Sequence, residues 1–342
     1  MQDRILRILG EKSKSHPAHS MRRPRRAAGH GFGLRCWVAL FSTLGCLHVR
    51  ARPPQVDGSQ ALQFVRGIVA IAPRHSGTDG ARQAARWIRE HCRDLGAAAR
   101  MDQWEEETAH GRKTFQNVIA VIPGRSANRV IVGSHYDGKY LPDVPDFPGA
   151  NDSGSSTGLL LEMIRVLADA PEPPPLTLEF AFFDGEECYE RYGPKDGLHG
   201  SKRHAADVRK RLKNYVAMIL LDMIGDRQLT VTLPRDSDPR LARLLLEEAA
   251  ERGWERHFGW FRRGTIIDDH KPFADIGLPA INVIDFEYGP GNSYWHTPED
   301  TMDKLSPRSL EIIGNTVMGL LWQLGEEFNT PDATDPETAP SP

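Results

Sequence analysis

The sequence is poor in cysteine, which limits what can hold the fold together. Four cysteines occur in 342 residues, and two of them, Cys36 and Cys46, lie within the first 51 residues. The other two, Cys92 and Cys188, form neither a spaced metal pair nor a disulfide framework. Cys92 falls in a helical pattern and is predicted to be buried as a small apolar group. These numbers exclude a disulfide-stapled domain and a cysteine-based zinc cluster.

Long hydrophobic runs are also lacking. The apolar stretch from Cys36 to Leu47 is too short to span a bilayer comfortably. It is preceded by Arg22, Arg23, Arg25 and Arg26, and small residues such as Gly45 and Cys46 stand at its end, which is the pattern of a secretory signal. We therefore predict that residues 1–51 are a signal or leader segment outside the fold, and that the protein is secreted or resides in the periplasm or envelope. A lipid anchor through Cys46, a translation start at Met21 and a disordered leader are alternatives left open.

Acidic residues outnumber basic ones after this leader. Residues 1–51 carry ten Lys/Arg and two Asp/Glu, whereas the rest of the chain carries 33 Lys/Arg and 44 Asp/Glu. Because phosphate contacts need clustered Lys and Arg, an acidic body argues against nucleic acid as a partner. We expect one catalytic domain over residues 52–328, followed by a disordered tail over residues 329–342 that is rich in Pro, Thr and Asp.

The body of the chain contains alternating helix and strand patterns. Helical spacing of apolar residues appears at 78–95, 153–170, 238–253 and 306–328. Apolar runs typical of strands appear at 117–124, 129–137, 176–187, 215–225 and 279–286. This alternation predicts an α/β three-layer sandwich, with a central, mostly parallel mixed β-sheet flanked by helices. In such sheets ligands bind at the carboxyl ends of the strands.

Side chains that can bind metal occur at these strand ends and in the loops beside them: His135, Asp152, Glu186 with Glu187, Asp222, and His296. Taken singly, each has an ordinary explanation, such as a helix N-cap for Asp152. Taken together, several buried carboxylates at one rim would repel one another, and a divalent cation removes that repulsion. Mixed His, Asp and Glu ligation suits zinc, and an open coordination position is typical of a catalytic site.

The ordered motifs HYD, GANDSGSS, FFDGEE, LLDMIG, DDHKPF and YWHTPEDT resemble metallopeptidase family twenty-eight over roughly residues 60–328. That family contains bacterial zinc aminopeptidases and animal glutaminyl cyclases. The resemblance implies a central mixed sheet flanked by helices. It also implies a catalytic carboxylate at Glu186 and the following metal ligands: Asp152, Glu187 and His296 for one zinc ion, with His135 and Asp222 as candidates for a second. Asp137 is expected to support His135, and Lys139 to be solvated.

The resemblance implies two alternative reactions at one site. In an aminopeptidase, two zinc ions bridged by Asp152 activate a water, and Glu186 takes its proton. In a glutaminyl cyclase, one zinc ion polarises the γ-carbonyl of an N-terminal glutamine, and the substrate's own α-amine attacks it with loss of ammonia. Because that nucleophile is tethered, positioning supplies much of the rate.

Asp268 favours the cyclase, because many aminopeptidases of the family have Ser there. It is expected to share a proton with Asp222, and Asp222 with Glu186, which makes these three the candidate catalytic acids. A protonated Asp222 would be a poor ligand for a second zinc ion, so we expect one ion. The alternative role for Asp268 is the cap of a short helix that begins at Asp269. GANDSGSSTG and HTPEDTMDKLS are closer to aminopeptidase sequences.

Three aromatic residues are expected to bind substrate: Trp295, Tyr192 and Tyr294. Tyr192 stands where animal cyclases have Trp. We expect a glutaminyl-peptide cyclotransferase, an acyltransferase, that acts on peptides or proteins with a free N-terminus and needs no obligate protein partner. A zinc aminopeptidase is the alternative. A non-catalytic binding module of the same fold ranks low, because all five ligand positions and Glu186 are intact.

Overall fold

The structure, a computed structural model, describes residues 52–329. The predicted leader and the predicted tail beyond residue 329 therefore lie outside the described residues. Within the described part, no helix combines the length and the apolar character that a bilayer span requires.

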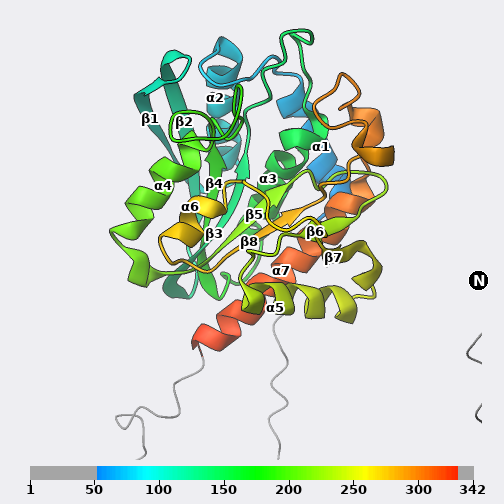
Figure 1. The fold of residues 1–342 in the computed structure, drawn as a ribbon. Coiled ribbons are helices and arrows are strands. Elements are labelled where there is room, and N and C mark those ends of the chain that lie inside the picture. Colours follow the sequence, from blue (N-terminus) through cyan, green and yellow to red (C-terminus); the bar gives the residue numbers. More distant parts are fainter. Residues whose placement is uncertain (1–51, 330–342) are drawn as a thin grey trace, which may run out of the picture. The chain divides into compact units, whose positions relative to one another are not determined.

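A six-stranded mixed sheet forms the middle layer (Figure 1). Its strand order is β1-β2-β4-β3-β5-β8. The four strands β4, β3, β5 and β8 run parallel, whereas β2 is antiparallel to both of its neighbours. The bounds are β1 Ala98–Thr108, β2 Gly111–Ile122, β3 Ser126–His135, β4 Leu176–Phe183, β5 Tyr215–Asp222 and β8 Ala280–Ile284. The parallel strands place their carboxyl ends at one edge of the sheet.

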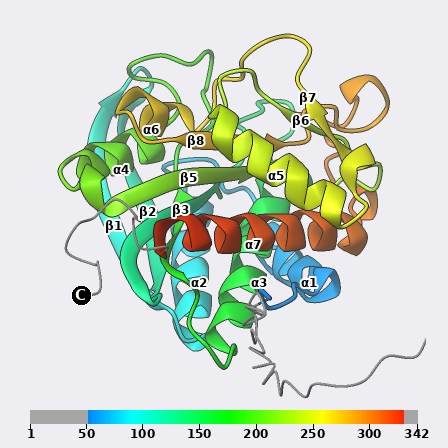
Figure 2. The same ribbon diagram turned by 90° about the horizontal axis from the view of Figure 1, so that it is seen from below.

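Helices cover both faces of this sheet (Figure 2). The larger core lies between the sheet and five helices: α1 (Gly58–Val69), α2 (Asp79–Asp94), α3 (Ser156–Ala168), α5 (Pro239–Glu251) and α7 (Pro307–Asn329). The smaller core lies under α4 (His199–Arg209) and α6 (Lys271–Asp275) on the other face. A two-stranded sheet of β6 (Val231–Leu233) and β7 (Phe258–Trp260) lies beside the main one. The predicted three-layer α/β sandwich is confirmed.

The central strands are buried along their whole length. All eight residues of β4 and all eight of β5 are buried, as the continuous apolar runs predict for strands covered on both faces. Glu179 is the charged exception within β4. Its carboxylate pairs with Arg129 at 3.0 Å and with His204 at 2.9 Å, which compensates its removal from water.

Several elements were missing from the sequence prediction, among them the two short strands β6 and β7. Helix α1 was not predicted, and neither was β1, which forms a long hairpin with β2. β1 is the edge strand and carries a Glu-Glu-Glu run with little burial, so it lacks the apolar alternation that identifies half-buried strands. The run predicted at 176–187 also ends as a strand at Phe183, so Glu186 and Glu187 stand in the loop that follows.

Helices α1 and α3 pack closely at Gly158. A Cβ atom at this position would lie 2.7 Å from the backbone nitrogen of Val65 and 2.9 Å from the carbonyl oxygen of Ala61. Both are backbone atoms of α1, so a side chain here would force the two helices apart.

We expect Gly158→Ala to lower the free energy of unfolding by about 1–2 kcal/mol in urea denaturation. Overpacking costs about 1–3 kcal/mol, which outweighs the gain of up to about 1 kcal/mol in helix propensity. Gly193→Ala is the control, because the nearest atom to a Cβ there is 3.9 Å away. A Gly158→Ala protein as stable as the parent would contradict the close packing of α1 on α3.

Candidate metal centre

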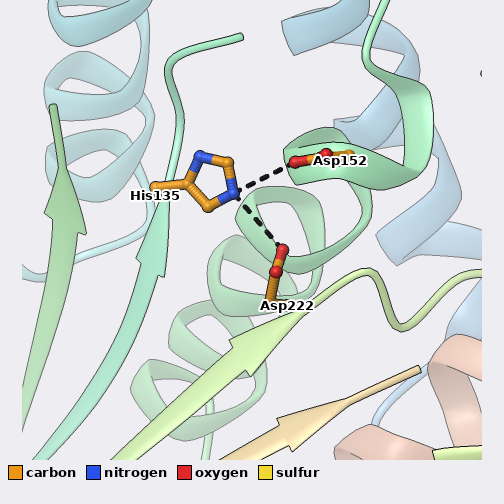
Figure 3. A group of neighbouring side chains, drawn as sticks. All are labelled: His135, Asp152 and Asp222. Carbon is orange, nitrogen blue, oxygen red and sulfur yellow. Dashed lines mark hydrogen bonds and ion pairs between the residues drawn. The ribbon is translucent and has the colours of Figure 1, made fainter. Parts of the chain in front are cut away.

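Three distant segments bring a first group of possible ligands together (Figure 3). His135 is the last residue of β3, Asp222 is the last residue of β5, and Asp152 lies in the turn Ala150–Ser155 that leads into α3. The Nε2 atom of His135 is 3.2 Å from Oδ1 of Asp152 and 3.3 Å from Oδ1 of Asp222. These strand ends meet at the carboxyl edge of the sheet, where the sequence pattern placed them.

A second group shares Asp152 with the first. Nε2 of His296 is 3.2 Å from Oδ2 of Asp152 and 3.1 Å from Oε1 of Glu187. In each group, one ligand atom per residue lies within 4.8 Å of the others. The two oxygens of Asp152 therefore face two neighbouring positions, as a carboxylate that bridges two cation sites does.

The electrostatics of both groups fit a divalent cation. Asp152, Glu187 and Asp222 are all buried, and buried carboxylates need a compensating positive charge. In this chain the histidines supply it. Burial alone would lower the pKa of His296, but the carboxylates of Glu187 and Asp152 raise this pKa to about 10. One imidazole and two carboxylates in each group form a donor set that suits zinc and leaves a coordination position open.

Asp137 contacts both His135 and the loop that carries Glu187. Its Oδ1 lies 3.5 Å from Nδ1 of His135, as expected from the sequence. The same carboxylate accepts hydrogen bonds from the backbone N–H groups of Glu186 at 3.1 Å and Glu187 at 3.3 Å. It thus fixes the loop after β4 relative to the end of β3.

Lys139 was expected to be solvated, and that expectation is wrong. Its side chain is only 13% exposed, and its Nζ lies 3.1 Å from Oε2 of Glu187. The same ammonium donates to the backbone oxygen of Cys188 at 2.5 Å. Glu187 therefore presents one oxygen to His296 and the other to a lysine. The pair comes from two loops, so sequence spacing gave no signal for it.

Asp300 holds the turn that carries Asp152 and was not singled out in the sequence. Its two carboxylate oxygens accept hydrogen bonds from the backbone N–H groups of Asn151 at 2.7 Å and Asp152 at 3.1 Å, and Tyr288 donates its hydroxyl at 2.9 Å. Burial raises the pKa of Asp300 to about 7. Asp300 lies four residues after His296 in the motif YWHTPEDT, and this position could have identified it from the sequence.

Arg74 supports the same turn from another loop. It is 1% exposed, and its guanidinium donates to the carbonyl oxygens of Tyr136, Pro148 and Gly149. A guanidinium can bind several carbonyls at once because its donors form a rigid planar fork. No sequence pattern indicated this role, since Arg74 lies outside every motif.

Glu186 lies beside the second group and is 5% exposed. Burial raises the pKa of its carboxyl well above the usual value. The hydroxyl of Tyr192 donates a hydrogen bond to its Oε1 at 2.9 Å. A buried acid with a raised pKa and a fixed orientation is suited to proton transfer. Tyr192 therefore contacts the predicted catalytic acid directly.

Asp268 is buried against Asn282, whose side-chain amide donates to it at 2.6 Å. Burial, followed by the charge of Asp222, raises the pKa of Asp268 to about 7. Within residues 52–329 no hydrogen bond joins Asp268 to Asp222, so the two acids influence each other through space. The alternative role of Asp268, as a helix cap, is partly met. Its carboxylate accepts a hydrogen bond from the backbone N–H of Asp269 at 2.6 Å, but α6 begins only at Lys271.

The other two aromatic candidates differ in position. Trp295 stacks on the ring of His296, with centroids 4.1 Å apart and an interplanar angle of 25°. Tyr294 packs on Tyr288 instead, with centroids 5.3 Å apart, and lies under the ammonium of Lys304. Trp295 therefore adjoins a predicted ligand, whereas the ring contacts of Tyr294 are with Tyr288 and Lys304.

Comparisons with known proteins agree with this geometry. Residues 117–321 match Peptidase family M28. A glutaminyl-peptide cyclotransferase-like protein of Mus musculus is 30% identical over 300 residues, which cover 79% of this chain and 76% of the relative. The crystal structure of a glutaminyl cyclase from an Acidobacteriales bacterium has a TM-score of 0.75 and 32% identity, and the match covers 81% of this chain and 98% of that chain.

A hydrolase shares the fold at lower identity. The structure of a Zn-dependent exopeptidase from Parabacteroides distasonis has a TM-score of 0.70 and 23% identity, over 79% of this chain and 99% of that chain. At that identity the likeness shows the fold alone. On the match over most of its domain and the similarity to cyclotransferases along most of its length, this chain belongs to Peptidase family M28, in its glutaminyl-cyclase-like branch.

Proposed function

We propose that this protein is a zinc-dependent glutaminyl-peptide cyclotransferase, which converts an N-terminal glutamine of a peptide or protein into pyroglutamate with loss of ammonia. One observation carries the proposal. Asp152, Glu187 and His296 converge within 4.8 Å next to the buried acid Glu186, in a chain whose relatives over most of its length are named glutaminyl-peptide cyclotransferases.

The metal ligands, Glu186 and Tyr192 have different roles in this reaction. A zinc ion held by Asp152, Glu187 and His296 would polarise the γ-carbonyl of the substrate glutamine. Glu186 carries the proton transfer: it takes a proton from the attacking α-amine and returns it to the departing ammonia. As nitrogen bonds to the carbonyl carbon, the bond to the amide nitrogen breaks. Tyr192 orients Glu186 through its 2.9 Å hydrogen bond.

Zinc aminopeptidase activity is the second candidate, and one observation favours it. The group of His135, Asp152 and Asp222 offers a second site that shares Asp152 with the first. Two neighbouring sites of this kind suit a two-metal aminopeptidase, in which the ions together activate a water. Against this, Asp222 lies within electrostatic reach of the buried Asp268, and burial raises the pKa of both carboxyls. Protons on these acids would weaken a second site.

We also propose that the protein acts outside the cytoplasm, because basic residues, a short apolar run and small residues follow one another in its first 51 residues. Recovery of the protein from the cytoplasmic fraction, with those residues retained, would contradict this location.

The purified protein should release ammonia from a peptide that begins with Gln and free little amino acid from one that begins with Leu. The reason is that the tethered α-amine of glutamine replaces an activated water as nucleophile. Ammonia and free amino acid are measured in parallel on the two peptides. Rapid hydrolysis of the Leu peptide with no ammonia from the Gln peptide would reverse the order of the two candidates.

Elemental analysis should give nearer one zinc ion than two per chain. His296→Ala should lose most of this zinc, because it removes a ligand of the occupied group, whereas the matched His135→Ala should retain it. Two ions in the parent, falling to about one in both variants, would support the two-site hydrolase instead.

Glu186→Gln should keep its zinc and lose turnover by on the order of a hundredfold or more, the usual effect of removing a general acid/base. Glu190→Gln makes the same chemical change on an exposed residue of the same loop and should stay near the parent rate. Steady-state rates and zinc content are measured for both variants. If Glu186→Gln turned over at the rate of Glu190→Gln, its assigned role would be wrong.

A further inference from the structure

Four rings from four separate loops pack together at the carboxyl edge of the sheet. We call His75, His110, Tyr140 and Tyr189 the aromatic shelf. Tyr140 packs on Tyr189 and on His75, both with ring centroids 5.2 Å apart. His110 stacks on Tyr189 at 4.8 Å and 30°. The loops before α2, between β1 and β2, after β3 and after β4 each contribute one ring.

The shelf adjoins the metal centre through two chain connections. Tyr140 follows Lys139 in sequence, and Lys139 reaches Glu187 at 3.1 Å. Tyr189 stands two residues after Glu187, and its hydroxyl donates to the backbone oxygen of Ser76 at 3.1 Å. Two of the four loops of the shelf therefore also supply one predicted ligand and its lysine partner.

The members of the shelf differ in how firmly they are held and how far they are exposed. Tyr189 is fixed by Lys113, whose ammonium donates to its hydroxyl at 2.8 Å. Tyr140 is 41% exposed, one of the few large hydrophobic side chains of the described chain with this exposure. A rigid ring thus supports an exposed ring. Ring packing alone would explain Tyr189, His75 and His110, but it leaves Tyr140 partly open to solvent, one residue after the lysine that contacts Glu187.

We propose that Tyr140, supported by the aromatic shelf, binds the side chain of the residue that follows the N-terminal residue of the substrate and selects aromatic side chains there. This proposal rests on the function proposed above and specifies its substrate class. Consecutive residues of an extended peptide lie about 3.5 Å apart, so a substrate with its first residue at the centre must pass its second over the rim. Loops on a rigid scaffold commonly set such preferences.

The chemistry of the shelf favours an aromatic partner. Aromatic rings gain about 0.5–1.5 kcal/mol from pairing beyond the area that they bury, which corresponds to a rate preference of roughly two- to thirteenfold. Tyr140 also needs no rearrangement to meet a ligand, because Tyr189 and His75 already hold its ring in place.

The test compares kcat/KM for Gln-Phe and Gln-Gly peptides of equal length. The parent should prefer Gln-Phe by roughly two- to thirteenfold. Tyr140→Ala should bring the ratio close to one, and Tyr140→Phe, which keeps the ring, should restore most of it. Phe328→Ala is the matched control. It removes a ring that is 43% exposed and lies near the end of α7, and it should leave the ratio unchanged.

Two results would overturn the shelf as a specificity site: a parent ratio near one, or a Tyr140→Ala protein that slows on both peptides while keeping the parent ratio. Failure of the proposed function is distinct, since it appears as no ammonia from any Gln peptide. In that event, the ratio is measured instead as hydrolysis of Leu-Phe and Leu-Gly peptides. A preference for Leu-Phe that Tyr140→Ala removes would support the shelf, and a ratio near one would contradict it.

Discussion

The structure depends on how it accommodates several carboxylates buried at one edge of a sheet. Asp152, Glu187 and Asp222 each lie less than a tenth exposed at the carboxyl ends of parallel strands or in the loops that follow. Removing such charges from water is costly, and only nearby positive charge offsets the cost. Two histidines, a lysine and the proposed zinc ion supply that charge, so the metal is part of the fold's electrostatics as well as of its chemistry.

A second layer keeps the ligands in place, and it consists mainly of contacts to backbone. Asp137 holds the N–H groups of the loop after β4, and Asp300 and Arg74 hold the turn that carries Asp152. A loop tied down through its backbone keeps its side chains in one orientation whatever their charge. Groups of this kind orient metal ligands in many proteins, and losing them weakens both binding and turnover.

The ligands at the strand ends could be predicted from the sequence, whereas the residues that hold them from other loops could not. The strands β4 and β5 and the ligands at their ends were predictable, because continuous apolar runs that end in acids leave few alternatives. The edge strand β1 was not, since its charged residues face water and hide the period of a strand. Lys139 and Arg74 were missed for another reason. Their partners lie in other loops, and no local pattern records a contact made only in three dimensions.

The choice between the two reactions depends on residues that do not bind the first metal ion. Both groups of ligands are complete, so the ligands alone permit one ion or two. The one-ion and two-ion reactions are distinguished by the residues around Asp222. Burial raises the pKa of this carboxyl, and it lies within electrostatic reach of Asp268, a second buried acid. Each proton kept by this pair reduces the negative charge available to a second cation. An acid at position 268 therefore favours chemistry with one ion and a tethered amine over chemistry with two ions and water.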